Sequence, residues 1–294
     1  MASAELQQLE RRIRSVESTK KITRAMELIA TARIGKAQLR LGQAAPYTAK
    51  MNEVIRNVAA ATGGISHPLL DRREVRTVGV LIVTSDRGLA GGYNSAVIRM
   101  AEHAIARHRA DGKDVRIYTI GKKAQSYFRY RRYQIERSWL GVTDTPSYAD
   151  ARSVAQILLN EYAEESVDSV EMYTTHYVSA LTQEPLMWPL LPIEAPETEE
   201  GAEEGGPIGY TFEPSPEEIL DRLLPRYLEA TAFGMLLEAS ASEHAARRRA
   251  MKAATDNAEE LTRILTRNKN QARQAEITTE ISEIVGGADA LAHG

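Results

Sequence analysis

The sequence predicts a mixed α+β and α/β fold, in which long N- and C-terminal helices pair as an antiparallel coiled coil with an α/β domain inserted between them. Two distributions lead to this prediction: 14 of the 17 aromatic residues lie between positions 61 and 213, and nine of the 11 prolines lie between 68 and 216. Aromatic side chains supply much of the buried area of a core, so the middle predicts a compact domain. The flanks, rich in Ala, Arg, Glu and Leu, predict helices.

Residues 1–61 are predicted to form the first helix. Its coiled-coil seam, with apolar residues at spacings of three and four, starts with Leu6, Leu9, Ile13 and Val16. Pro46 is expected to kink or interrupt the helix, because proline lacks a backbone N–H. Gly63 and Gly64 are expected to close the segment.

The seam of this first helix then becomes polar. Lys20 and Thr23 occupy the next two positions of the strict heptad. We expect the apolar stripe to resume after a shift, at Ile22, Met26 and Ile29, because a shift of this kind alters the local winding of a coiled coil.

Residues 75–193 are predicted to form the α/β domain. The predicted strands are 77–84, 115–120 and 170–177, and the predicted helices are 94–110, 122–130 and 149–164. The first strand is an almost continuous apolar run, as expected for a strand buried on both faces, and the alternation of strands and helices implies a small parallel sheet. Residues 194–215, acidic and rich in proline and glycine, are predicted to form an exposed linker.

Residues 216–294 are predicted to form the second long helix. Ser215 is a good N-cap, and Pro216 suits the first helical position. The predicted seam consists of Ala254, Ala258, Leu261, Leu265, Asn268, Ala272 and Ala275. Pro225 is expected to mark a kink, and Gly286–Gly287 is expected to end the helix.

The two terminal helices have narrow apolar stripes, so neither is expected to be stable alone. Antiparallel pairing still leaves a thin core, which indicates that the pair lies inside another assembly. The end of the chain carries a further apolar stripe: Ile277, Ile281, Ile284 and Val285. This stripe either caps the helix pair or needs a surrounding protein to cover it.

Composition excludes several classes of protein. The formal net charge is −3, from 37 basic and 40 acidic residues, which argues against a protein that coats nucleic acid by charge. The chain has no cysteine, which excludes disulfides, thiolate metal sites and a cysteine nucleophile. It has no apolar run of membrane-spanning length and no apolar leader, so neither a transmembrane helix nor a signal peptide is predicted.

The glycine-rich segment 85–94, SDRGLAGGYN, follows a predicted strand and opens a helix, where phosphates often bind. It matches neither phosphate-binding pattern and has no lysine at the phosphate position, so a tight turn is favoured over a ligand site. The six histidines show neither metal-ligand spacing nor a sequence cluster with carboxylates, and the G-x-S-x-G pattern is absent. The sequence therefore predicts no catalytic, cofactor-binding or metal-binding residues.

Basic residues form two clusters in the terminal segments. The first contains Arg11, Arg12, Arg14, Lys20, Lys21 and Arg24, and the second contains Arg247, Arg248, Arg249 and Lys252. Solvated helix faces are one explanation for both clusters. The first cluster interrupts a seam, where charge costs stability, so a protein partner with acidic loops explains it equally well.

Four segments together resemble the gamma subunit of F-type ATP synthases, the central stalk of the catalytic head. They are KKITRAMEL at 20–28, SDRGL at 85–89, MKAATDNA at 251–258 and ARQAEITTEI at 272–281. The resemblance covers nearly the whole chain in the same order. It implies a Rossmann-like domain between the paired helices and a rotor that couples rotation of the membrane c ring to ATP synthesis or hydrolysis at the alpha/beta ring, with no catalytic residues or cofactor of its own.

The resemblance also implies contact roles for individual residues. Contacts with the alpha/beta ring fall on Lys20, Lys21, Arg24, Met26, Arg247, Arg273, Gln274, Thr278, Glu280, Ile281, Ile284 and Val285. The C-terminal members are expected near Met26, and the last three in an apolar bearing. Tyr210 and Glu213 are expected to contact the epsilon subunit and the c ring.

The implied partners are the alpha, beta and epsilon subunits and the c ring, with delta, a and b in the whole complex and no nucleic acid. The implied location is the cytoplasmic face of a bacterial plasma membrane, reached only through the complex. Two alternatives remain at this point. One is an enzyme that binds a nucleotide through the segment 85–94, and the other is a coiled-coil scaffold or nucleic-acid-binding protein that uses the basic clusters.

Overall fold

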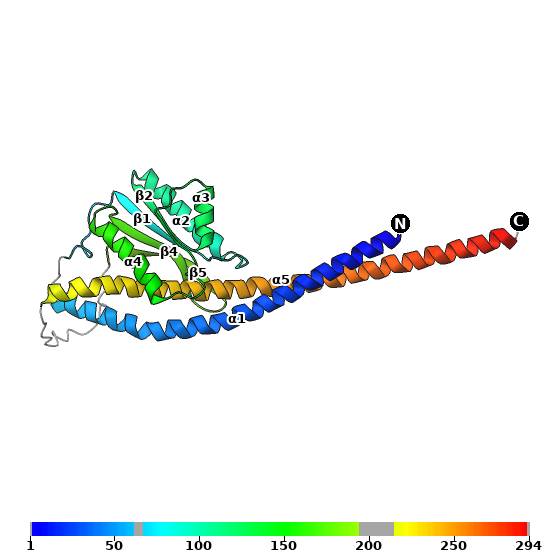
Figure 1. Cartoon of the computed structure of the whole chain (residues 1–294), viewed down its shortest axis with the longest axis horizontal. Helices are drawn as coiled ribbons and strands as arrows, with labels where there is room; N and C mark the ends of the chain where they lie inside the picture. Colours follow the sequence, from blue (N-terminus) through cyan, green and yellow to red (C-terminus); the bar gives the residue numbers. More distant parts are fainter. Residues whose placement is uncertain (1, 62–66, 194–214, 293–294) are drawn as a thin grey trace. The chain divides into compact units, whose positions relative to one another are not determined.

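The computed structural model describes residues 2–61, 67–193 and 215–292. Contacts divide the chain into two units. The coiled-coil unit consists of Met1–Ala30 and Arg248–Gly294, and the sheet unit consists of Thr31–Arg247. Two helices contribute to both units: α1 (Ala2–Ala61) and α5 (Pro216–Ala292). The predicted pair of long terminal helices with an α/β domain between them is confirmed (Figure 1).

Neither the two prolines expected to kink the long helices nor the glycine pair expected to end the second one terminates a helix. Pro46 lies inside α1, and Pro225 and the Gly286–Gly287 pair lie inside α5. Beyond Pro46, α1 continues because its next turns are anchored in the core of the sheet unit, where Met51 is buried. A glycine costs only about 1 kcal/mol relative to alanine in a helix, which is too little to stop α5 two turns from its end.

In the part of the sheet unit that the structure describes, there are five strands and three helices besides the two long ones. The strands are β1 (Thr77–Val83), β2 (Asp114–Ile120), β3 (Arg137–Trp139), β4 (Ser169–Tyr177) and β5 (Gln183–Leu191). The helices are α2 (Tyr93–Ala110), α3 (Lys122–Tyr130) and α4 (Tyr148–Ala163). The strand order is β3-β2-β1-β4-β5, with β1 to β4 parallel and β5 antiparallel to β4.

Two of these strands were not predicted. β3 has three residues, too few for a recognisable pattern. β5 contains Pro185 and Pro189, and proline normally argues against a strand because it cannot donate a ladder hydrogen bond. β5 tolerates both prolines because it is an edge strand, with a hydrogen-bonded neighbour on one side only.

Apolar cores cover both faces of the sheet. β1 supplies both, because Leu81 and Val83 point into one core while Val80 and Ile82 point into the other. The first core lies under α4 and the parts of α1 and α5 that belong to the sheet unit, and the second lies under α2 and α3 (Figure 1). Burial of β1 on both faces confirms the interpretation of its apolar run.

No helix within the described ranges is both long and apolar enough to cross a membrane.

Candidate partner interface

Within the coiled-coil unit, α1 and α5 pair in opposite directions. Thr255 Oγ1 lies 2.8 Å from Thr23 Oγ1, and Lys20 Nζ lies 3.4 Å from a carboxylate oxygen of Glu259. Nearer the start of α1, Glu10 pairs with Lys269 at 3.9 Å. Each step toward the N-terminus of α1 thus matches a step toward the C-terminus of α5. By this register, α1 begins opposite the turn of α5 that contains Ile277.

The seam of α1 does not shift, contrary to expectation. Thr23 and Ala30 are buried on the strict heptad, whereas Ile22 and Ile29 are 59% and 55% exposed. The seam tolerates polar residues because they find partners across it or along it: Thr23 donates to the carbonyl oxygen of Lys20 at 3.1 Å and contacts Thr255.

Only alternate members of the seam predicted for α5 are buried. Ala258 and Leu265 are buried as expected, but Leu261 is 40% exposed and Thr262 takes its place. Thr255 is likewise buried one residue after the expected Ala254. Both threonine hydroxyls donate to the carbonyl oxygen four residues earlier, at 2.8 Å, so a threonine loses no hydrogen bond at the seam.

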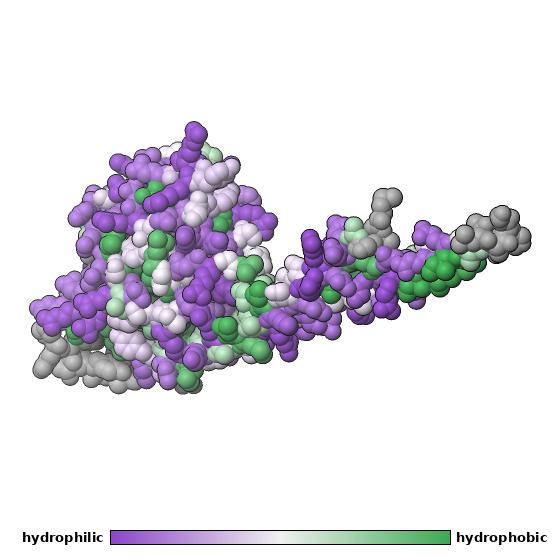
Figure 2. All heavy atoms as spheres, turned by 45° about the vertical axis from the view of Figure 1, so that its right-hand side comes forward, coloured by the Kyte–Doolittle hydropathy of each residue, from purple (hydrophilic) through white to green (hydrophobic). Residues whose placement is uncertain are grey.

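Large apolar side chains are therefore left on the outside of the coiled-coil unit. The exposed ones are Ile22, Leu28, Ile29, Leu261, Ile264, Ile277, Ile281, Ile284 and Val285. A band of apolar surface follows α5 toward its C-terminal end (Figure 2). Contiguous apolar surface on a soluble protein marks an interaction site.

The residues expected to contact the ring have different surroundings. Those that are exposed are Lys21, Arg24, Arg273, Gln274, Thr278, Glu280, Ile281, Ile284 and Val285. Lys20 and Met26 are half-buried. The C-terminal members do not lie near Met26, because the register places Gln274 about 30 Å farther along α5 at 1.5 Å per residue. Tyr210 and Glu213 lie outside the described residues.

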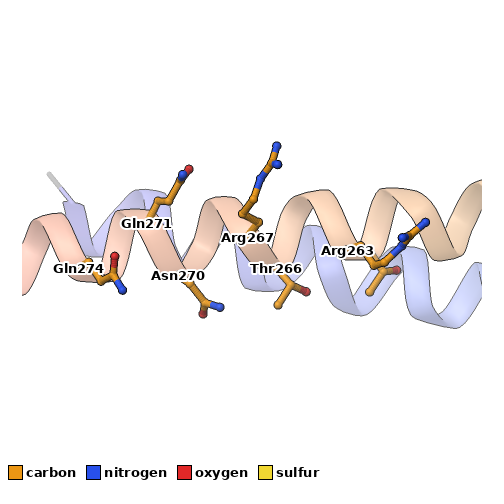
Figure 3. A pocket seen from close by; sticks show the side chains of 7 residues that line it. Arg263, Thr266, Arg267, Asn270, Gln271 and Gln274 are labelled. Carbon is orange, nitrogen blue, oxygen red and sulfur yellow. The ribbon is translucent and has the colours of Figure 1, made fainter.

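A shallow groove with polar side chains runs along α5 beside the seam, from residue 262 to residue 274. It is lined by Thr262, Arg263, Thr266, Arg267, Asn270, Gln271 and Gln274 (Figure 3). Arg263 forms an ion pair with Glu260 on the same helix. Amide, hydroxyl and guanidinium groups suit polar or acidic partner side chains, whereas the neighbouring surface is apolar.

Arg247 does not face a partner, contrary to expectation. It is 7% exposed and belongs to the sheet unit. Its Nη2 atom lies 2.8 Å from Oε1 of Glu243 and donates to the carbonyl oxygens of Arg87 and Gly88, at 3.5 and 3.3 Å. The guanidinium is therefore bonded inside the chain.

The segment 85–94 folds as a turn whose polar groups are bonded internally. The Ser85 N–H donates to Asn94 Oδ1 at 2.8 Å, and the Asp86 carboxylate accepts from the N–H groups of Lys122 and Gly141 at 3.1 and 3.0 Å. With Arg247 bonded to its carbonyl groups, this loop favours the turn over a nucleotide site.

One histidine does lie among carboxylates, contrary to expectation. Ligand atoms of His244, Glu243 and Asp144 lie within 4.8 Å of one another. The carboxylates already have cationic partners, since Arg247 pairs with Glu243 and Arg33 pairs with Asp144. Burial raises the pKa of Glu243 and lowers the pKa of His244, so His244 favours its neutral form. The sequence did not reveal this group because Asp144 lies about 100 residues away.

Comparison with known proteins identifies the family. A family model described as ATP synthase matches residues 5–291. An ATP synthase gamma chain of Kineococcus radiotolerans is 48% identical over 297 residues, covering 99% of this chain and 98% of the relative. One from Acidothermus cellulolyticus is 51% identical over 294 residues, covering 98% and 97%.

Solved structures show the same fold. A chain of the Euglena gracilis mitochondrial ATP synthase, in a structure of OSCP, F1 and c-ring, matches with a TM-score of 0.67 and 16% identity, covering 98% of this chain and 95% of that one. A chain of the Tetrahymena thermophila mitochondrial ATP synthase central stalk and c-ring gives 0.60 and 20% identity, covering 79% and 99%. From the sequence matches, the chain belongs to the ATP synthase gamma chain family.

Proposed function

We propose that the chain is the rotor of a proton-translocating F-type ATP synthase, which couples rotation of the membrane c ring to ATP synthesis or hydrolysis at a ring of alpha and beta subunits. As a gamma chain, it is a subunit of the enzyme complex and has no catalytic role of its own. The observation that carries the proposal is the exposed apolar stripe on the last turns of α5: Ile277, Ile281, Ile284 and Val285.

The exposure of this stripe is evidence that another protein surrounds the end of α5. Beyond the turn of Ile277, the register gives α5 no partner from α1. A lone helix of this length is marginal in water, and Ile281 and Ile284 are 57% and 72% exposed. A sleeve of protein that covers the stripe on all sides removes both problems and leaves the helix free to turn.

Rotation of the helix pair can change nucleotide affinity in the surrounding subunits when the pair has different side chains on its different sides. Lys21 and Arg24 are exposed on α1, a polar groove follows α5, and apolar residues such as Ile22 and Leu261 lie outside the seam. Each orientation of such a pair stabilises a different conformation in each subunit around it, which is a coupling free energy between rotor angle and nucleotide affinity.

The proposed contacts with the alpha/beta ring fall on both long helices. They are Lys20, Lys21, Arg24, Met26, Arg273, Gln274, Thr278, Glu280, Ile281, Ile284 and Val285, without Arg247. Tyr210 and Glu213 remain proposed contacts with the epsilon subunit and the c ring. Membership of the family implies peripheral association through the complex. We place that complex on the cytoplasmic face of a bacterial plasma membrane, with delta, a and b as further subunits.

The first experiment identifies what binds the chain. An affinity tag inserted in the exposed α2–β2 turn at Gly112 leaves both helix ends untouched. Gentle extraction from membranes should recover alpha, beta and epsilon subunits with ATPase activity. Recovery of the chain alone, or measurable nucleotide binding by the isolated chain, would contradict the proposal and favour the nucleotide-binding alternative.

A pair of variants tests the apolar stripe itself. Ile281→Asn with Ile284→Asn should lower ATP-driven proton pumping in membrane vesicles by about two-fold or more, because polar groups replace the apolar contact surface. The matched control is Tyr130→Asn with Leu140→Asn, which removes exposed apolar side chains from the sheet unit. Equal losses in both pairs would show that the stripe has no special role.

A further inference from the structure

We infer that Arg247, paired with Glu243, is a positioning residue that locks α5 to the carboxyl edge of the sheet and so transmits torque between the sheet unit and its own long helix. The inference rests on the proposed rotor function. We call this contact the edge junction. It consists of the α5 segment from Glu238 to Arg247 and three other chain segments: the loops that follow β1 and β3, and the C-terminal end of β4.

The first segment is the loop between β1 and α2. Arg247 donates to the carbonyl oxygens of Arg87 and Gly88, as described above. The Tyr93 hydroxyl donates to the carbonyl oxygen of Ala239 at 3.1 Å. Ala90, Tyr93 and Ala246 also form a small buried apolar cluster of their own. These hydrogen bonds are made near both ends of the α5 segment, at Ala239 and at Arg247. They therefore prevent α5 from rotating about its own axis relative to the loop.

The second segment is the loop between β3 and α4. The Ser240 hydroxyl donates to the carbonyl oxygen of Asp144 at 3.1 Å, and His244 Nε2 lies 3.3 Å from the same oxygen. A carbonyl only accepts, so Nε2 carries the proton and Nδ1, 3.5 Å from Nη1 of Arg247, accepts. The Asp144 carboxylate pairs with Arg33 of α1, which brings the other long helix into the junction.

The third segment is the end of β4. The Ser242 hydroxyl donates to the carbonyl oxygen of Thr175 at 3.4 Å. The Glu238 carboxylate accepts from the Tyr177 N–H at 3.4 Å and lies 2.5 Å from Nδ1 of His176. In open α/β sheets, ligands bind outside the carboxyl ends of the strands. Here the chain's own helix makes its polar contacts at that edge.

Burial distinguishes the Glu243–Arg247 pair from surface pairs. Glu243 is 1% exposed and Arg247 is 7% exposed. A pair this buried adds little net stability, but breaking it leaves an unpaired charge, so it fixes geometry more than it adds free energy. Apolar packing resists rotation of a helix only through the shapes of the side chains that interlock. Directional bonds to three segments resist the same motion until several of them break together.

The test uses the whole ATP synthase in sealed vesicles, with Glu243→Gln and Arg247→Met combined so that no buried charge is left unpaired. Under low load we expect ATP hydrolysis and protons pumped per ATP to match the wild type. Against a large proton gradient, we expect protons pumped per ATP to fall by about two-fold or more, because load favours slip at the junction. Arg247→Lys, which keeps the charge but loses the planar fork, should be intermediate.

A merely structural defect gives a different result. Loss of assembled complex lowers hydrolysis and pumping together at every load and leaves their ratio unchanged. An unchanged ratio at high load, with the complex assembled, overturns the inference while the rotor function stands. Loss of coupled pumping in the wild-type complex itself would overturn the rotor function instead.

A reversible crosslink sharpens the test, because the chain has no cysteine. Ala90→Cys and Ala246→Cys, added to the double variant, place two thiols in the small cluster that joins the loop to α5. Oxidation, followed by gel mobility, should restore the high-load ratio, and reduction should abolish it again. A crosslink that forms without restoring the ratio contradicts a role in transmission.

Discussion

The two units of this chain bury very different cores. The sheet unit buries whole aromatic rings such as Tyr118, Tyr162 and Phe128. In the coiled-coil unit, the buried residues within the described ranges are Thr23, Ala30, Met251, Thr255, Ala258 and Leu265. The sheet unit therefore buries the larger apolar side chains, whereas the coiled-coil unit keeps its large apolar residues outside, where a partner can bury them.

The polar groups of the two units also serve different purposes. In the coiled-coil unit, the pairs Lys20–Glu259 and Glu10–Lys269 each join a half-buried lysine to an exposed glutamate, so they set register at little gain in stability. In the sheet unit, the buried charges of Glu243 and Arg247 join segments distant in sequence. The comparison suggests one unit built to be enclosed and one built to hold a helix.

The largest expected effect is on the free energy of unfolding, when one leucine in each unit is replaced by alanine. Leu81 is fully buried in β1, so Leu81→Ala should lower the free energy of unfolding by about 3 kcal/mol. Leu261 is 40% exposed, so Leu261→Ala should cost less than about 1 kcal/mol. Trp139 and Trp188 both lie in the sheet unit, so fluorescence during urea unfolding reports that unit, and circular dichroism at a helical wavelength reports both. Equal losses would break the comparison.

An intermediate effect is expected at His244 as the pH falls. Burial lowers its pKa from the unfolded value of 6.5, so the unfolded chain binds the proton more tightly and stability falls below about pH 6.5. His244→Gln removes this dependence. Between pH 7.5 and 5.5, the free energy of unfolding should therefore fall further in the wild type than in the variant.

Glu243 makes the opposite contribution, because its raised pKa favours the folded state as pH falls. It is present in both proteins, so the difference between their urea midpoints isolates the histidine. Parallel pH profiles for the two proteins would mean that His244 is not held neutral in the edge junction.

The smallest expected effect tests the polar seam. Thr23→Val with Thr255→Val replaces both hydroxyls by groups of similar shape, so helix stability should change by less than about 1 kcal/mol. Either single variant should cost more than the pair, since it removes one side of the contact. Thermal melting followed by helical circular dichroism measures all three. A large loss of thermal stability in the double variant would show that the hydroxyl hydrogen bonds contribute net stability to the coiled-coil unit.

Local patterns in the sequence determined the elements of this protein. The run from Thr77 to Val83 specified a strand buried on both faces, and α3 begins and ends at the predicted residues. The spacing of apolar residues placed Ala258 and Leu265 at the seam. These features were predictable because periodicity and capping act within a few turns of the chain.

Tertiary structure decided the rest, because the deciding partner lies far away in sequence. At the seam of α5, Thr255 is buried in place of the predicted Ala254, and its partner across the seam is Thr23 of α1. β5 accepts two prolines because the sheet makes it an edge. Arg247 belongs to the sheet unit because the carbonyl groups of Arg87 and Gly88 meet it across about 160 residues of chain, and no local pattern encodes a contact between groups so distant in sequence.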